Sequence, residues 1–268
     1  SKSSSYGIGV AAKIDSDGFS AGLHLAANGS RGDADGQSVT HTNSQISAGE
    51  QLHLQSGGDT RLLGAVAQGE QITADIGGDL TLQSLQDTQT YDSESQSLGG
   101  SVTIGLGGSG SAHYSQSDVK ANYASVNQQS GLQAGGGGFQ LQVDGNTTLN
   151  GGVISSSDTA VENRKNNLDT ANIHTQDIQN RSRYSAESIG VSTGGAGYGH
   201  DSDTEKSTTQ AGISGIAGHT DVRTGDQETG LKNNFDAQEV ESDIQAQQQI
   251  TAEFGQESSK AWGDYTGS

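Results

Sequence analysis

The chain has no cysteine, no methionine and no proline among its 268 residues. Without cysteine, neither a disulfide framework nor a thiol site can form, and such a chain is compatible with export across an outer membrane. No apolar run in the sequence approaches the roughly 18 residues of a membrane-spanning helix. Because residue 1 is a serine in a polar tract, we interpret the sequence as an interior piece of a larger polypeptide.

Basic residues are scarce. Lys and Arg total 13 against 32 Asp and Glu, which gives a formal net charge of −19. Nucleic-acid binding requires clustered Lys and Arg that neutralise phosphates, so this balance disfavours nucleic acid as a partner. The same balance disfavours direct electrostatic docking on anionic lipid.

Large apolar residues are also scarce. Ile, Leu, Val and Phe together make up about 17% of the chain, below the roughly 20% typical of a packed domain, and with this charge the first expectation is disorder. However, the apolar residues are periodic, and Gly, Ser, Thr, Asn and Gln fill the gaps between them. A parallel β-helix tolerates this composition because its narrow core needs few apolar side chains per coil. We therefore favour an ordered all-β solenoid.

A near-verbatim echo at a spacing of 87 residues supports a repeat architecture. The segment 58–66 returns as 145–153, with Gly, Thr, Leu, Gly and Val in register. A repeated unit of this length predicts an elongated array, which serves more often as a scaffold or interaction surface than as an enzyme. The signature residues are Gly58, Thr60, Leu62, Gly64, Val66, Gly145, Thr147, Leu149, Gly151 and Val153.

Three alternating segments predict β-hairpins. Their turns are expected at Asp15–Gly18, Gly107–Ser111 and Gly194–Gly195. A hairpin is only marginally stable alone, so its apolar face must cover the β-helix flank, another hairpin or a foreign surface such as lipid. The alternation is also typical of outer-membrane strands. The residues of this expected face are Tyr6, Ile8, Val10, Phe19, Leu23, Leu25, Val102, Ile104, Leu106, Ile189 and Val191.

The last forty residues differ from the rest. Glycine thins after Leu231, and Ala237, Val240, Ile244, Thr251 and Phe254 fall roughly on one helical stripe, which Gln247 interrupts. The sequence thus predicts a short C-terminal helix within 231–268, either a cap for the terminal rung of the solenoid or a linker to downstream sequence.

As a set, these motifs resemble the hemagglutinin repeats of large bacterial exoproteins, the filamentous hemagglutinins and contact-dependent growth-inhibition effectors exported by two-partner secretion. The resemblance covers most of the chain. It implies a right-handed parallel β-helix with protruding β-hairpins over residues 1–230, in modules of about 1–94, 95–184 and 185–230. The segments that carry it are 58–66, 78–82, 86–88, 145–153, 208–213, 235–236 and 249–255.

The resemblance implies a non-catalytic segment that helps present or deliver a C-terminal toxin to a contacted cell at its outer membrane. The alternative is a structural stalk of a filamentous hemagglutinin-type adhesin. The implied location is secreted or on the bacterial cell surface, with the target-cell outer membrane as a further site. The implied partners are the target-cell outer membrane or a surface receptor, and the outer-membrane transporter of two-partner secretion. No toxin sequence lies within these residues.

Individual site motifs are weak. Arg31, Gly32 and Asp33 form a cell-attachment tripeptide, but we expect turn chemistry in a Gly- and Asp-rich loop. Asp15–Gly18 and Asp33–Gly36 are similar to the start of a calcium loop but lack the bidentate Glu, so hairpin turns are favoured. We expect no cofactor and leave weak calcium binding in the loops open. The seven histidines share no ligand spacing, and the sequence contains no nucleophile elbow or Asp cluster beside a cationic pair, so we expect neither a metal site nor catalysis.

Overall fold

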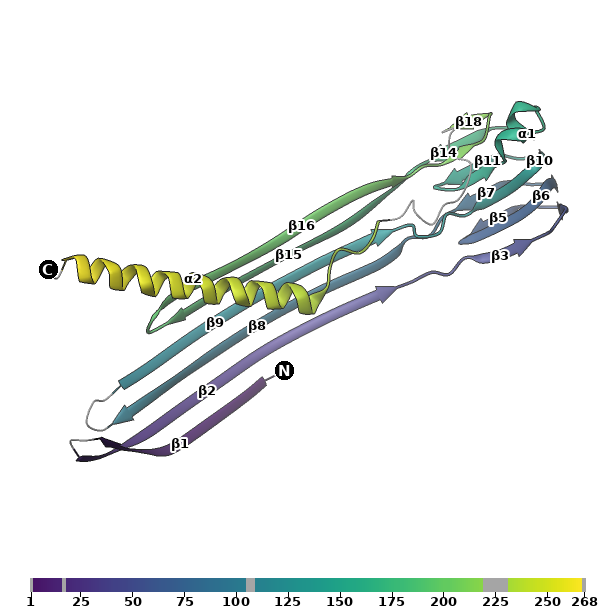
Figure 1. Ribbon diagram of the computed structural model, residues 1–268. Coiled ribbons are helices and arrows are strands. Elements are labelled where there is room, and N and C mark those ends of the chain that lie inside the picture. The colour runs from purple at the N-terminus through teal and green to yellow at the C-terminus, as the bar shows by residue number, and fades with distance from the viewer. Residues whose placement is uncertain (1, 16–17, 105–108, 219–230, 267–268) are drawn as a thin grey trace.

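A computed structural model of the protein describes residues 2–15, 18–104, 109–218 and 231–266. This part of the chain is mostly β-strand and forms three sheets with two helices, so the expectation of an all-β protein is confirmed. One sheet consists of long antiparallel strands, and it extends away from a stack of shorter parallel strands (Figure 1).

The long sheet has six strands in the order β1-β2-β8-β9-β15-β16, and each strand is antiparallel to its neighbours. Three hairpins, β1–β2, β8–β9 and β15–β16, thus lie side by side in one sheet. We call the end with the hairpin turns the tip and the end joined to the stack the base. The strands are β1 (Lys2–Asp15), β2 (Gly18–Val39), β8 (Asp87–Ile104), β9 (Ser109–Ser125), β15 (Ile178–Ser192) and β16 (Gly195–Thr209).

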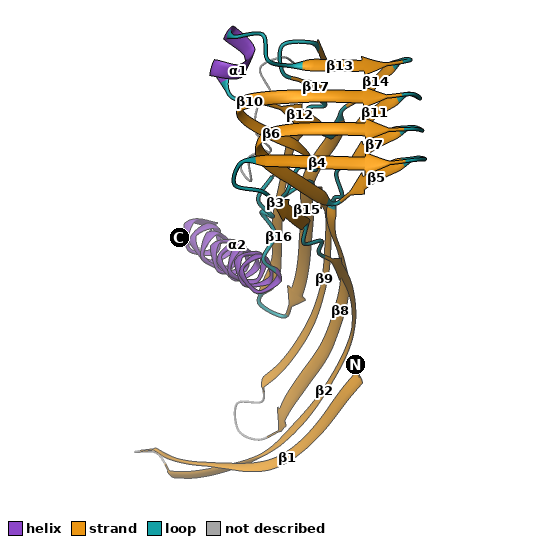
Figure 2. Ribbon diagram, turned by 90° about the vertical axis from the view of Figure 1, so that its right-hand side faces the viewer, coloured by secondary structure: helices purple, strands orange, loops and turns teal. Residues whose placement is uncertain are grey.

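The stack consists of an eight-stranded sheet and a four-stranded sheet whose strands pair in parallel, except for the antiparallel β17–β18 pair. Figure 2 shows β4, β6, β10 and β13 as successive layers. The eight-stranded sheet contains β3 (Ser44–Ser47), β4 (Gln51–Ser56), β6 (Ala65–Ile76), β10 (Gly131–Val143), β12 (Val153–Ser155), β13 (Asn167–Thr170), β17 (Gly212–Ile213) and β18 (Ala217–Gly218). The four-stranded sheet contains β5 (Thr60–Leu63), β7 (Leu80–Gln83), β11 (Thr147–Asn150) and β14 (Ile173–Gln176).

Apolar side chains stack in register through these layers. Leu52 pairs with Ile72, which pairs with Phe139, and all three are buried. On the facing sheet, Leu82 and Leu149 are fully buried neighbours. Each layer therefore contributes only a few apolar residues, and the stacking of layers removes them from water. This arrangement explains how a sequence with few apolar residues still builds a core.

The two copies of the 87-residue echo lie two layers apart in the stack. Strand β5 of the first copy and β11 of the second both pair with β7, one on each side. The path from β5 to β7 is short, whereas the path from β7 to β11 detours through the hairpin β8–β9. Gly64 and Gly151 occupy equivalent corners with φ of 57° and 58°, in the left-handed region that favours glycine.

A buried polar joint fixes the long sheet to the stack. Asp87, the first residue of β8, accepts hydrogen bonds from the His41 backbone N–H and the Asn127 side-chain amide, both at 2.6 Å. Asp87 is 9% exposed, so these bonds compensate the burial of its carboxylate. The joint gives a structural role to the Gln86–Thr88 segment that the sequence singled out.

The longer helix, α2 (Ala237–Thr266), packs against β16 and β15 and runs toward the tip (Figure 1). The short helix α1 (Asp158–Glu162) lies beside β10. The expected short C-terminal helix is in fact 30 residues long, and it covers the antiparallel sheet instead of the terminal rung of the stack. Gly197 and Gly199 lie beneath the helix and allow its backbone to approach the sheet closely.

Several other expectations need correction. The right-handed parallel β-helix is not confirmed, because the sheets are mixed and the hairpins join into one antiparallel sheet instead of protruding separately. Arg31, Gly32, Asp33 and the segment 33–36 lie inside strand β2, not in a loop, because each residue pairs with β8. The expected turn at Gly107–Ser111 is too long, since β9 already begins at Ser109. The other two hairpins turn near the expected places.

Candidate functional site

Strand alternation gathers the apolar residues of all three hairpins on one face of the long sheet. Val102 pairs with Leu25, and Leu25 pairs with Ile8. Paired positions of antiparallel strands share one face of a sheet, so these backbone positions form a continuous row. The next row toward the tip joins Ile104, Leu23 and Val10.

This face is exposed. We call it the apolar tip face and define it by eight residues whose exposed fractions run from 38% to 64%. A cluster of large apolar side chains in water is unusual for a soluble monomer and marks a contact surface for a partner or a membrane. The eight residues are Leu25, Leu98, Val102, Ile104, Tyr114, Ile189, Val191 and Tyr198.

The structure brings together the five expected residues whose side chains it describes. Leu25, Val102, Ile104, Ile189 and Val191 belong to the apolar tip face. Leu98, Tyr114 and Tyr198 complete it, and the two-residue alternation along the strands of each hairpin is the signal for them. The side chains of Tyr6, Ile8, Val10, Phe19, Leu23 and Leu106 lie outside the described residues.

The apolar tip face changes into a charged surface toward the base. Asp33, Glu94, Asp118 and Glu187 are cross-strand neighbours in one row, and Glu187 pairs with His200. Like charges directly opposite one another are destabilising in a sheet, and water must screen them. Lys120 offsets part of this charge, and its ion pair with Asp118 at 3.1 Å raises the pKa of the lysine. One face of the sheet therefore has an apolar tip and a base that needs water.

The opposite face carries α2, and small residues, Ser188, Gly190, Gly197 and Gly199, lie directly beneath the helix. Ile244 is fully buried there, and Ser188 donates a hydrogen bond to its carbonyl oxygen at 3.0 Å. Before the helix, Phe235 packs between Tyr91 and Tyr184 at ring distances of 5.2 and 5.9 Å. Burial, together with a hydrogen bond to Asp201, raises the pKa of Tyr184 to about 12. The long sheet is thus covered by its own chain on this face only, within the part that the structure describes.

The Arg31–Gly32–Asp33 tripeptide does not have the form of an exposed loop. Arg31 Nε lies 3.4 Å from Asp33 Oδ2, and both side chains point to the same face of β2. The two charged groups therefore engage each other at the charged base of the sheet. Both side chains are about two-thirds exposed, and the cell-attachment role stays a prediction.

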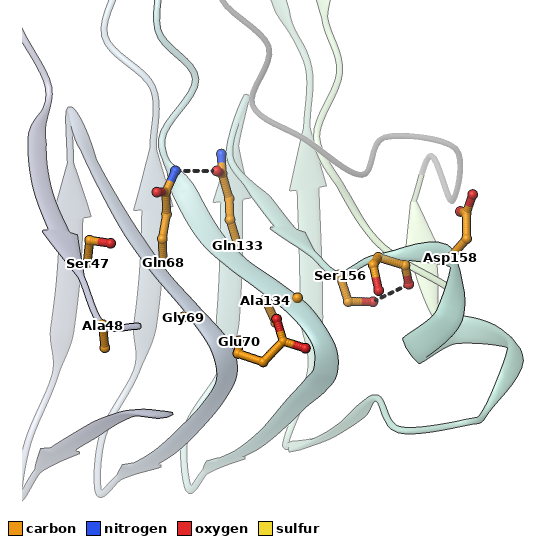
Figure 3. Close-up of a pocket in the computed structure, with 11 residues that line it drawn as sticks. Ser47, Ala48, Gln68, Gly69, Glu70, Gln133, Ala134, Ser156 and Asp158 are labelled. Carbon is orange, nitrogen blue, oxygen red and sulfur yellow. Dashed lines mark hydrogen bonds between the residues drawn. The ribbon is translucent and has the colours of Figure 1, made fainter. Parts of the chain in front are cut away.

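A second candidate is a groove of about 620 Å³ on the outside of the stack (Figure 3). Its walls include the Gln68 and Gln133 side chains, which hydrogen-bond each other at 2.8 Å, and the carboxylates of Glu70 and Asp158. Its lining also includes the hydroxyl-bearing residues Ser47, Ser156 and Ser157. Within the described residues, no group of three or more His, Cys, Asp or Glu is placed to hold a metal ion.

The signature residues have structural positions in the stack. Thr147, Leu149 and Val153 are fully buried, while Gly64 and Gly151 form corners. Among the histidines, His53 lies on the outer surface, where its Nδ1 is 2.9 Å from Thr73 Oγ1. The signature therefore builds the scaffold, and the apolar tip face remains the strongest candidate for a functional surface.

Comparison with known proteins identifies relatives of the chain. Residues 1–98 match a family model described as Hemagglutinin repeat. Toxin CdiA of Escherichia coli is 40% identical over 235 residues, 83% of this chain and 7% of that protein. The tRNA nuclease CdiA of Yersinia mollaretii is 43% identical over 196 residues, 66% of this chain and 6% of that protein. The Deoxyribonuclease CdiA of Dickeya dadantii is 41% identical over 195 residues, 71% of this chain and 6% of that protein.

The chain therefore spans less than a tenth of the length of these curated relatives. No solved structure matches the chain. Within the described residues, no helix combines the length and the apolar character that a membrane crossing requires.

Proposed function

We propose that the chain, which belongs to the hemagglutinin-repeat family of CdiA-type exoproteins, is a non-catalytic segment of such a protein. We propose further that it helps deliver a C-terminal toxin at the outer membrane of a contacted cell. In this proposal the protein is secreted through a two-partner secretion transporter and acts at the bacterial surface. We propose that the nuclease activities named for two of these relatives belong to parts of those proteins outside the matched segment, which covers 6% of each.

The observation that carries the proposal is the apolar tip face. Eight large apolar side chains from five strands lie exposed on one side of a single sheet. Burying such side chains is worth roughly 25 cal/mol for each Å² removed from water. A membrane offers this gain without a specific receptor, and the negative charge of the chain argues that apolar contact, not charge, drives the association.

The division between tip and base fits this role. The row formed by Asp33, Glu94, Asp118 and Glu187 must stay in water, whereas Val102 and Ile104 near the tip gain from leaving it. Tyr114 and Tyr198 lie at the border between the two regions, and tyrosine favours such interfaces because its ring is apolar and its hydroxyl is polar. We propose that the tip enters the lipid and that the base remains outside.

The stack of parallel strands supplies the other half of the proposal. We propose that its layers are turns of a right-handed β-helix that holds the long sheet away from neighbouring domains. The in-register ladders β4-β6-β10-β13 and β5-β7-β11-β14 support this interpretation. The same rigid stack is the observation that favours the alternative, a passive stalk of an adhesin.

Flotation with outer-membrane vesicles tests the proposal. The unaltered chain should float with vesicles, and the double variant Val102→Asp, Ile104→Asp should lose most of this association because two buried carboxylates are costly in lipid. The matched control is Ser101→Asp, Thr103→Asp, whose residues alternate with the first pair and point to the opposite face. The control should float like the unaltered chain.

The same variants, placed in a toxin-bearing parent protein, separate delivery from the stalk. Delivery predicts that Val102→Asp, Ile104→Asp abolishes killing of target cells while cell attachment persists. A stalk predicts that both variants kill normally. An unaltered chain that never floats with vesicles would remove the basis for delivery by lipid contact.

A further inference from the structure

An antiparallel sheet that does not close has two edges, and here they are β1 and β16. Each edge strand has unpaired backbone N–H and C=O groups, which can pair with another strand. The two edges differ in what covers them within the described residues. This asymmetry, together with the order of the hairpins, points to an assembly mode.

Helix α2 covers the edge of β16. The His200 backbone N–H donates to Gln247 Oε1 at 3.0 Å, and the Thr251 hydroxyl lies 3.0 Å from the Tyr198 carbonyl oxygen. These are groups of β16 that point away from β15. A β-carbon on Gly197 or Gly199 would overlap the helix backbone, so the glycines allow α2 to lie this close. The helix therefore occupies hydrogen-bonding groups that an added strand would use.

The edge of β1 has no such cover in the part of the chain that the structure describes. Strand β1 is 14 residues long and pairs only with β2. In both outer hairpins two residues separate the last pair, Asp15–Gly18 in one and Ser192–Gly195 in the other. Equal loop lengths give equal hydrogen-bond alternation. The even-numbered residues of β1, Ser4 among them, therefore direct their backbone groups outward, as Tyr198 and His200 do in β16.

The two edges match in direction. Strand β1 runs toward the tip and β16 runs away from it, so β16 of one copy beside β1 of another makes an antiparallel pair with both tips at the same end. On both strands the outward-directed groups belong to residues that face the apolar side, so the apolar tip faces of the two copies would be continuous. A flipped orientation would place the apolar face of one copy beside the small-residue face of the other.

The sheet already contains two strand pairings of this kind. The second strand of one hairpin pairs with the first strand of the next at β2–β8, through 17 residue pairs, and at β9–β15, through 12 pairs. We propose that β16 of one copy pairs in the same way with β1 of a second copy, head to tail. We propose also that α2 blocks this strand pairing until the helix is displaced. The partner is thus a second copy of this chain.

Mass measurements in lipid-free solution test this inference. The unaltered chain should remain at its single-chain mass of 27.4 kDa. Ile244→Asp, which places a carboxylate under α2, should release the helix and produce species at multiples of that mass. Gly199→Val provides a second release variant because its side chain would meet the helix backbone. Hydrogen exchange over residues 237–253 confirms that the helix has left the sheet.

Substitutions in the edge strand β1 then test whether the copies pair through this edge. Adding Ser4→Pro to either release variant should return the protein to single-chain mass, since proline removes one outward N–H of β1 without breaking the pairing with β2. Adding Ser4→Ala should leave the assembly intact. Adding Val102→Asp should also leave it intact, which separates edge pairing from contact through the apolar tip face.

Three results would overturn the inference. A released helix with the protein still at single-chain mass means that the β16 edge does not pair. Assembly that survives Ser4→Pro but fails with Val102→Asp means that copies associate through the apolar tip face. An unaltered chain that assembles as far as the release variants means that α2 blocks nothing. None of these results depends on membrane binding.

Discussion

Gly199 of β16 lies directly beneath Ile244 of α2, so close that a β-carbon on the glycine would overlap the Ile244 carbonyl oxygen. We predict that Gly199→Ala weakens docking of α2 by about 1–3 kcal/mol, the usual cost of overpacking. Gly190→Ala is the matched control, because its β-carbon meets only the flexible end of the Gln248 side chain. Hydrogen exchange of the α2 amides measures both, and equal protection in the two variants would show that the close approach is unimportant.

Phe235 anchors the segment that leads into α2. It is 9% exposed and packs on Tyr91 and Tyr184 from two hairpins. We predict that Phe235→Ala costs about 3–5 kcal/mol of local stability, the range for deleting a buried aromatic ring. Limited proteolysis near residues 231–236 should become much faster, while the stacked strands keep their protection. Unchanged proteolysis would contradict the anchoring role.

The pKa of Tyr184, raised to about 12 by burial and by its bond to Asp201, predicts a dependence on pH. The neutral phenol is favoured in the folded state, so its contribution to stability is complete below pH 10 and is lost as pH rises from 10 to 12. Docking of the Phe235 segment should weaken in this window. Tyr184→Phe should show a shallower loss there, as followed by near-ultraviolet circular dichroism. A steeper loss in the variant would contradict the assignment.

Gly151 tests the corners of the stack. Its φ of 58° and the contact of a built β-carbon with the Ile178 side chain both oppose any other residue. We predict that Gly151→Ala lowers the free energy of unfolding by about 1–3 kcal/mol in urea. Gly58→Ala, where a β-carbon has open space and φ is ordinary, should change it by less than about 0.5 kcal/mol. Similar losses for both variants would argue against a special role for the corner.

Local patterns could predict the strands and the apolar face. The alternation around Val102 and Ile189 and the turn at Asp15–Gly18 each depend on a few neighbouring residues, so the sequence alone predicts them. The 87-residue echo likewise identified equivalent strands, although it could not show that β7 lies between them.

Long-range pairing decided the rest. Gly32 and Asp33 favour turns, yet they lie in β2 because pairing with β8 overrides local preference. Gln247 interrupts the apolar stripe of the helix for a reason that only the structure reveals, namely its bond to the His200 N–H at the sheet edge. The joining of three hairpins into one sheet involves residues that are 49 to 81 positions apart, and no local pattern specifies it.

The most direct test of the account is which face of the long sheet meets lipid. Because the chain has no cysteine, a single cysteine can carry a polarity-sensitive dye at Val102 or at its neighbour Ser101. With outer-membrane vesicles, we predict a blue shift of emission for the dye at position 102 and little change at position 101. No shift at position 102, or an equal shift at both positions, would contradict lipid contact through the apolar tip face.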